Sequence, residues 1–104
     1  MTPPLSPRAR QVLDIFFNPK DVSETSLWLE EECGNNLPSC GQQDEYGIER
    51  IRFATIKLSK GNTLKLLKAI DEAQMDWRDL LIAADFGSDV NPHEAWVKDI
   101  VGKT

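Results

Sequence analysis

Few residues of this chain have the type and setting to carry catalytic chemistry. His93 is the only histidine, and an imidazole with a pKa near neutrality could act as a general base. It follows Asn91-Pro92 and precedes Glu94, the pattern of a capped helix N-terminus, where a polar residue has a structural reason to occur. No serine or cysteine motif stands beside it. We therefore expect no catalytic residue, and a small enzyme using His93 is kept as an alternative.

Metal and cofactor chemistry has no recognisable motif in the sequence. The two cysteines, Cys33 and Cys40, have a Cys-x6-Cys spacing that differs from zinc-knuckle spacing. Adding His93 still leaves a fourth ligand unassigned. No glycine pattern of a dinucleotide site or a P-loop occurs. We expect neither a metal nor a cofactor, while a disulfide between the two thiols under oxidation stays open.

The charged residues are unevenly distributed, which points to binding. The net charge is -5, yet segment 50–70 holds only basic charged residues. Such a segment could contact nucleic acid, but the neighbouring segment 76–87 carries three acids against one arginine and would repel phosphates. Charge asymmetry also steers proteins toward one another. The sequence favours a protein partner or self-association, and a nucleic-acid-binding helical domain using the basic 50–70 segment is the alternative.

The predicted contact surface combines these cations with one tryptophan. Trp28 lies in an acidic segment with a thin apolar face, where an exposed aromatic side chain could anchor a partner. Acidic and basic segments could also meet in a homodimer. The expected function is a non-catalytic protein-interaction or regulatory module. The predicted contact residues are Trp28, Arg50, Arg52, Lys57 and Lys60.

Helices must position these residues, and their start and stop signals are frequent. Ser6 precedes a proline, and Asn62 and Asp76 each precede an apolar helical pattern, as helix N-caps do. Asn18-Pro19 is expected to end the first helix, because the residue before a proline avoids helical geometry. Gly87 is expected to stop the helix that Asp76 begins. The bundle is expected to consist of helices over 6–18, 48–58, 63–74, 76–86 and 92–101, and a further short helix over 22–33 is expected outside it.

The apolar spacing predicts which faces of these helices are buried. Segment 48–58 has apolar residues on two sides, which predicts a central helix. In the next segment Leu67 is assigned to the core, and Leu81 is assigned to the core of 76–86. Residues 20–47 are expected to lie outside the core.

The chain length, the composition and the helix signals together predict one all-α domain, a compact bundle of four to five short helices over residues 1–104. Its composition, 40% hydrophobic and 28% charged, is ordinary for globular proteins. Residues 1–5 are expected to form a flexible tail and 34–47 a long polar loop. No run approaches the ~20 apolar residues of a bilayer span, so no membrane is expected. Sparse cysteines favour the cytoplasm.

Four motifs occupy the C-terminal half: R-I-R-F-A at 50–54, L-S-K-G-N at 58–62, D-W-R-D-L-L at 76–81, and His93 with Trp96 as H-x-x-W. On these motifs the chain resembles a group of small uncharacterised bacterial proteins. The resemblance covers about half of the chain. It implies an all-helical architecture and carries no activity with it.

Overall fold

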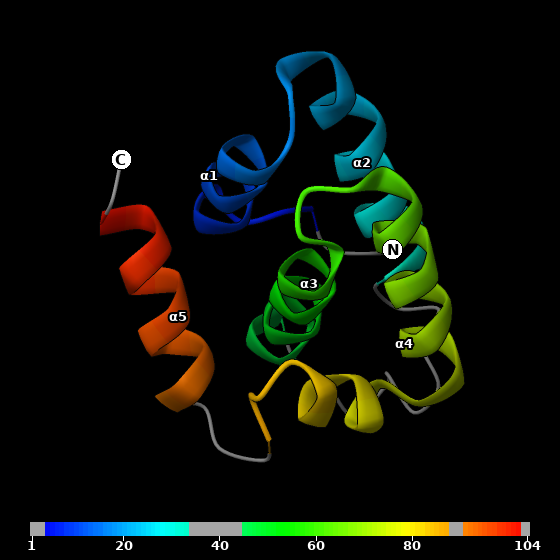
Figure 1. Cartoon of the computed structure of the whole chain (residues 1–104), viewed down its shortest axis with the longest axis vertical. Helices are drawn as coiled ribbons and strands as arrows, with labels where there is room; N and C mark the ends of the chain where they lie inside the picture. Colours follow the sequence, from blue (N-terminus) through cyan, green and yellow to red (C-terminus); the bar gives the residue numbers. More distant parts are fainter. Residues whose placement is uncertain (1–3, 34–44, 88–90, 103–104) are drawn as a thin grey trace.

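The chain folds into an all-α bundle, as the sequence predicts. The computed structural model describes residues 4–33, 45–87 and 91–102, and within these ranges it has helices and no strand. None of the helices described is long and apolar enough to cross a membrane. The helices, shown in Figure 1, are α1 Pro7–Phe16, α2 Pro19–Glu32, α3 Glu45–Ser59, α4 Thr63–Ala83 and α5 Asn91–Gly102.

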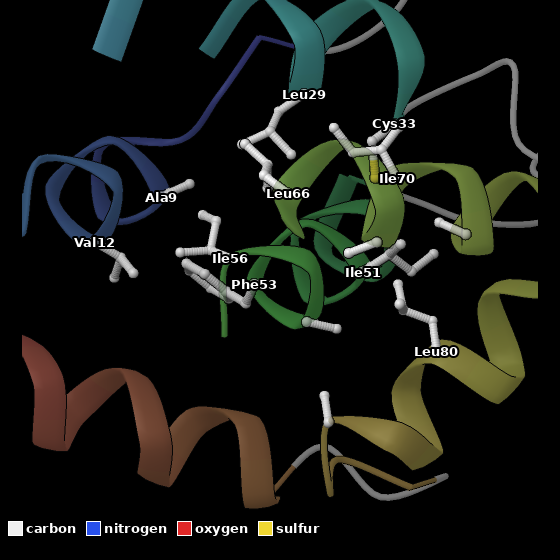
Figure 2. Close-up of a cluster of buried hydrophobic side chains, with 14 of the residues drawn as sticks. Ala9, Val12, Leu29, Cys33, Ile51, Phe53, Ile56, Leu66, Ile70 and Leu80 are labelled. Atoms are coloured by element: carbon white, nitrogen blue, oxygen red, sulfur yellow. The ribbon is translucent and has the colours of Figure 1, made fainter. Parts of the chain in front are cut away.

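Helix α3 is the centre of the bundle, and the other helices surround it (Figure 1). Its side chains Ile51, Phe53 and Ile56 are at most 1% exposed. In Figure 2 they lie among side chains from α1, α2 and α4. Because α3 contacts α1, α4 and α5, it needs apolar groups on more than one side. The prediction that segment 48–58, with apolar residues on two sides, forms a central helix is therefore confirmed.

The junction of α1 and α2 corrects one prediction. The Ser6 hydroxyl accepts from the Ala9 amide at 3.1 Å and caps α1, as expected. However, Pro19 does more than end this helix, because it occupies the first turn of α2. Asn18 takes an extended conformation between the two helices. Proline suits a first helical turn, whose amides lack intrahelical partners, so α2 begins before the predicted start at 22.

Helix α2 packs against the core, which contradicts the expectation that 20–47 lies outside it. Leu29, Thr25 and Cys33 are each 0% exposed. The Thr25 hydroxyl donates to the Asp21 carbonyl at 2.9 Å, so its polar group is satisfied within the helix. Because threonine, serine and cysteine form part of this buried face, its apolar pattern is weak, and the sequence does not reveal that α2 is buried.

The structure describes parts of the predicted tail, 1–5, and of the predicted loop, 34–47, and those parts are ordered. Leu5 is 6% exposed, and its amide donates to Glu30 Oε2 at 2.9 Å, so residues 4 and 5 are anchored and the predicted tail is wrong there. Residues 1–3 lie outside the described residues. Of the predicted 34–47 loop, residues 45–47 form the first turn of α3. Residues 34–44 lie outside the described ranges.

Helix α4 consists of two helical segments that meet at a kink. Asn62 caps the first, accepting from the Lys65 amide at 3.0 Å. Asp76 leaves helical geometry, with φ -161° and ψ 98°, and its Oδ1 accepts from the Arg78 amide at 3.0 Å. Both predicted N-caps are thereby confirmed. An extended residue whose carboxylate caps the following turn starts a new helical segment in a changed direction.

The end of α4 differs from the prediction. The helix stops at Ala83 rather than at 86, and the Phe86 amide donates to the Leu81 carbonyl at 2.9 Å. Two residues there have positive φ, Asp85 at 64° and Gly87 at 58°. Aspartate is among the few non-glycine residues that adopt this conformation readily, so the chain turns before the glycine that the sequence singles out.

Candidate functional site

Two cations of the predicted contact surface bind the chain segment that follows α4. Arg50 Nη2 donates to the Phe86 carbonyl at 3.2 Å and also to the Gly87 carbonyl. Lys57 Nζ donates to the Ala84 carbonyl at 2.7 Å. Carbonyls at a helix C-terminus carry partial negative charge and lack intrahelical partners, so a cation stabilises them. These two side chains therefore hold the end of α4 against α3.

Arg52 is a buried connector. It is 2% exposed, Nε donates to the Cys33 carbonyl at 2.9 Å, and Nη1 donates to the Pro4 carbonyl at 3.2 Å. It thus joins α3 to the end of α2 and to the N-terminal segment. A charged side chain at such depth requires hydrogen-bond partners, and these carbonyls are two of them.

The five predicted contact residues are therefore not gathered on one surface. Arg50, Arg52 and Lys57 bond backbone carbonyls of their own chain, and Trp28 is half-buried against the core. Lys60 is exposed, in the turn between α3 and α4, with φ 52°. The sequence shows the positive charge of these residues but not the carbonyls that bind them.

His93 lies inside the protein, which the sequence does not indicate. It is 0% exposed, with its ring centroid 6.1 Å from that of Phe53 and 5.9 Å from that of Phe86. Its Nε2 lies 3.0 Å from Glu94 Oε2. Burial lowers the pKa of His93, and nearby Arg50 lowers it further, against the carboxylate of Glu94. The imidazole is thus neutral at pH 7 and packed against aromatic rings.

An ion-pair cluster beside His93 joins α1, α3 and α5. Arg8 donates to Glu49 Oε1 at 2.6 Å and to Glu94 Oε1 at 2.8 Å. Its guanidinium carbon also lies 5.4 Å from the centre of the Phe53 ring. Hydrogen bonds to Glu94 and Glu49 raise the pKa of Arg8, and Ser6 Oγ donates to Glu49. The cluster positions three helices through charge-assisted hydrogen bonds.

A groove of about 480 Å³ opens between α1 and α5. Its polar walls are Arg8 and Glu94, which bond each other, together with Gln11 and Lys98. His93 is not among the side chains that line it. Because its one carboxylate already bonds an arginine, the groove offers no activated base or nucleophile along its walls.

The thiol and carboxylate positions give no metal centre in the part of the chain that is described. Among those residues no three histidine, cysteine or acidic side chains are close enough to hold a metal ion. Cys33 is buried at the end of α2. Cys40 lies outside the described ranges, so the question of a disulfide with Cys33 stays open, as it does in the sequence.

The clearest exposed feature is a set of apolar side chains on α4, one of which, Leu67, is expected in the core from the sequence. Leu64 is 75% exposed, Met75 is 82% exposed and Leu67 is 38% exposed. The buried face of the helix is formed instead by Leu66, Ala69, Ile70 and Ala73. The assignment of Leu67 to the core is therefore wrong. The two alanines make the buried face less conspicuous than the leucines of the other face.

These exposed residues have the spacing of a helical contact face. Leu64, Leu67, Lys68, Asp71 and Met75 follow the i, i+3, i+4, i+7, i+11 pattern and share one side of the helix. We call these five residues the α4 outer stripe. Its C-terminal end meets a hollow of about 410 Å³ at the kink, whose lining residues are Glu72, Met75, Asp76, Asp79, Leu80 and Ala83.

The motif residues of the C-terminal half have structural contacts. Phe53 and Trp96 pack with ring centroids 6.2 Å apart, and Asp76 caps the second segment of α4. Gly61 has φ 81°, and a Cβ at this position would lie 2.8 Å from the Phe16 carbonyl oxygen. The motifs thus encode contacts between helices. Comparison with protein-family models, with curated proteins and with solved structures finds no match for the chain.

Proposed function

We propose that this chain is a non-catalytic protein-interaction module whose contact surface is the α4 outer stripe. The observation that carries the proposal is the exposure of Leu64 and Met75, 75% and 82%, on a helix whose opposite face is already buried. Single exposed apolar side chains are common, but apolar side chains aligned on one face are typical of binding surfaces.

The spacing supports recognition through a helix face. Partners that bind a helix in a groove read apolar anchors at spacings such as i and i+3, which Leu64 and Leu67 occupy, while Lys68 and Asp71 place charges at i+4 and i+7. Covering a leucine or methionine side chain stabilises a complex by ~1.5–3 kcal/mol. Met75 adds a flexible side chain that adapts to different partner surfaces.

The proposed function is of the class predicted from sequence, but its contact surface is the α4 outer stripe instead of the predicted contact residues. Arg50, Arg52 and Lys57 bond carbonyls within the chain, so reversing their charge would damage the fold before it tested a surface. Lys60 stays close to the new surface, in the turn before α4. Asp71 and Glu72 follow the exposed cations on the same helix and would repel phosphates, which argues against the nucleic-acid alternative.

Kinship and location are part of the same proposal. We infer kinship with the small bacterial proteins that share the four motifs, and the motifs themselves are the support for it. We also infer a cytoplasmic location, supported by the low cysteine content and the buried Cys33.

Site-specific photo-crosslinking tests the proposed surface. Leu64 or Met75 is replaced by the photoreactive residue p-benzoylphenylalanine, and the chain is irradiated in the cell that produces it. Ala95, exposed on α5 beside the groove, is the matched control position. We expect a defined protein adduct from positions 64 and 75 and none from 95. No adduct at 64 and 75, or the same adduct at all three positions, would contradict the proposal.

A further inference from the structure

The charges along the α4 outer stripe are ordered. Lys65 and Lys68 lie in the N-terminal part of α4, and Asp71 and Glu72 follow toward the kink. All four side chains are exposed. Lys68 and Asp71 lie within the stripe, between its leucines and Met75, whereas Lys65 and Glu72 lie along one flank of it.

The stability of the helix itself does not account for this order. The dipole of a helix favours acids near its start and cations near its end, but the segment of α4 before the kink has no acid in its first turn and has Asp71 and Glu72 toward its end. A lysine placed before an acid, as Lys68 before Glu72, is also the less favourable orientation of an i, i+4 pair. Charge complementarity to a binding partner would account for the order of these charges.

We propose that the α4 outer stripe binds the same stripe of a second copy of this chain, antiparallel and about a two-fold axis. This inference rests on the proposed function and identifies the partner. A two-fold axis between Ala69 and Ile70 places Leu64 opposite Met75 of the second copy and Lys68 opposite its Asp71. The apolar ends of the two stripes then meet, and a cation meets an acid at the centre.

The flanking charges fit the same arrangement. An antiparallel two-fold axis brings the same flank of the two helices together, so Lys65 of each copy lies near Glu72 of the other. A parallel arrangement would instead place Lys68 beside its own copy and Asp71 beside its own copy, and like charges would repel. The charge order therefore selects antiparallel pairing.

The size of the stripe sets the expected strength of association. Leu64 and Met75 are separated by a helical rise of ~16 Å, so the seam is short compared with stable dimer interfaces. We expect reversible dimerisation that depends on protein concentration. Because the pairs between Lys65 and Glu72 lie at the exposed edge of the seam, association is weaker in high salt.

Sedimentation velocity over a concentration series tests the inference with charge-reversal variants of the full chain. One variant carries Lys65→Glu and Lys68→Glu, and the other carries Asp71→Lys and Glu72→Lys. Each alone places like charges opposite one another in the antiparallel dimer, so we expect self-association at least about tenfold weaker than wild type. Mixing the two variants pairs an acidic stripe with a basic stripe, and we expect association to return.

A matched control reverses two exposed charges of α2, through Lys20→Glu with Glu24→Lys, and should dimerise as wild type does. Circular dichroism of each variant checks that it is folded. If the variant mixture fails to associate while wild type dimerises, the antiparallel arrangement is wrong.

The experiment also separates this inference from the proposed function. If wild type stays monomeric at all concentrations while photo-crosslinking from position 64 captures another protein, self-association is wrong and the interaction module stands. A monomer without any crosslinked adduct overturns both.

Discussion

Neighbouring leucines on α4 give a sharp test of which face of this helix is buried. Leu66 is 0% exposed, whereas Leu64 is 75% exposed. Leu→Ala removes three carbon groups, worth ~0.8 kcal/mol each when buried, so Leu66→Ala loses ~2.4 kcal/mol of transfer free energy. The cavity that remains brings the expected loss of unfolding free energy to ~2–5 kcal/mol.

The same substitution at Leu64 has a different expected result. Since only a quarter of this residue is covered, Leu64→Ala loses ~0.6 kcal/mol at most, offset in part by the higher helix propensity of alanine. Urea denaturation followed by circular dichroism measures both variants against wild type. Equal losses at the two positions, or the larger loss at Leu64, would refute the assignment of the faces.

Three further predictions concern the backbone and the buried polar groups. Gly61→Ala should lower the unfolding free energy by ~1–3 kcal/mol, since a Cβ there combines positive φ with a close contact to the Phe16 carbonyl. Gly102→Ala, with nothing within 4 Å, is its control and should be neutral by the same denaturation assay. His93, the only histidine, should titrate in an NMR pH series with a midpoint below its ordinary 6.5, because burial lowers its pKa. The unfolded chain then binds more protons, so the His93 contribution to stability is complete above pH 6.5 and falls as the pH drops toward the folded pKa; a midpoint at or above 6.5 would contradict its burial. Arg52→Met should cost ~1.5–3 kcal/mol for each hydrogen bond lost to a backbone carbonyl, measured by thermal unfolding, and a neutral result would show that these bonds do not stabilise the fold.

The start of a helix is predictable from sequence where one residue caps the helix with its own side chain. Ser6, Asn62 and Asp76 cap helices through their own side chains, and the information for a cap lies within a few residues of sequence. The two-sided apolar pattern of 48–58 likewise predicted a helix at the centre of the bundle.

Features that depend on distant segments were not predictable. The backbone carbonyls bound by Arg50 and Arg52 belong to segments far away in sequence, so these residues resembled free surface cations. His93 has the local pattern of a helix start, and its burial depends on Phe53 and Phe86. The choice between the two apolar faces of α4 likewise depends on α3, which covers one of them.

If the exposed face of α4 is a protein-contact surface, the side-chain methyl group of Met75, which is 82% exposed, reports on it directly. The chain is labelled with ¹³C-methyl methionine, and the Met75 resonance is followed by NMR in rising concentrations of unlabelled chain and in cell extract. Met75→Leu identifies the resonance. We expect this signal to shift or broaden on contact. A signal that stays sharp and unshifted under both conditions would rule out a protein-contact surface on this face of α4.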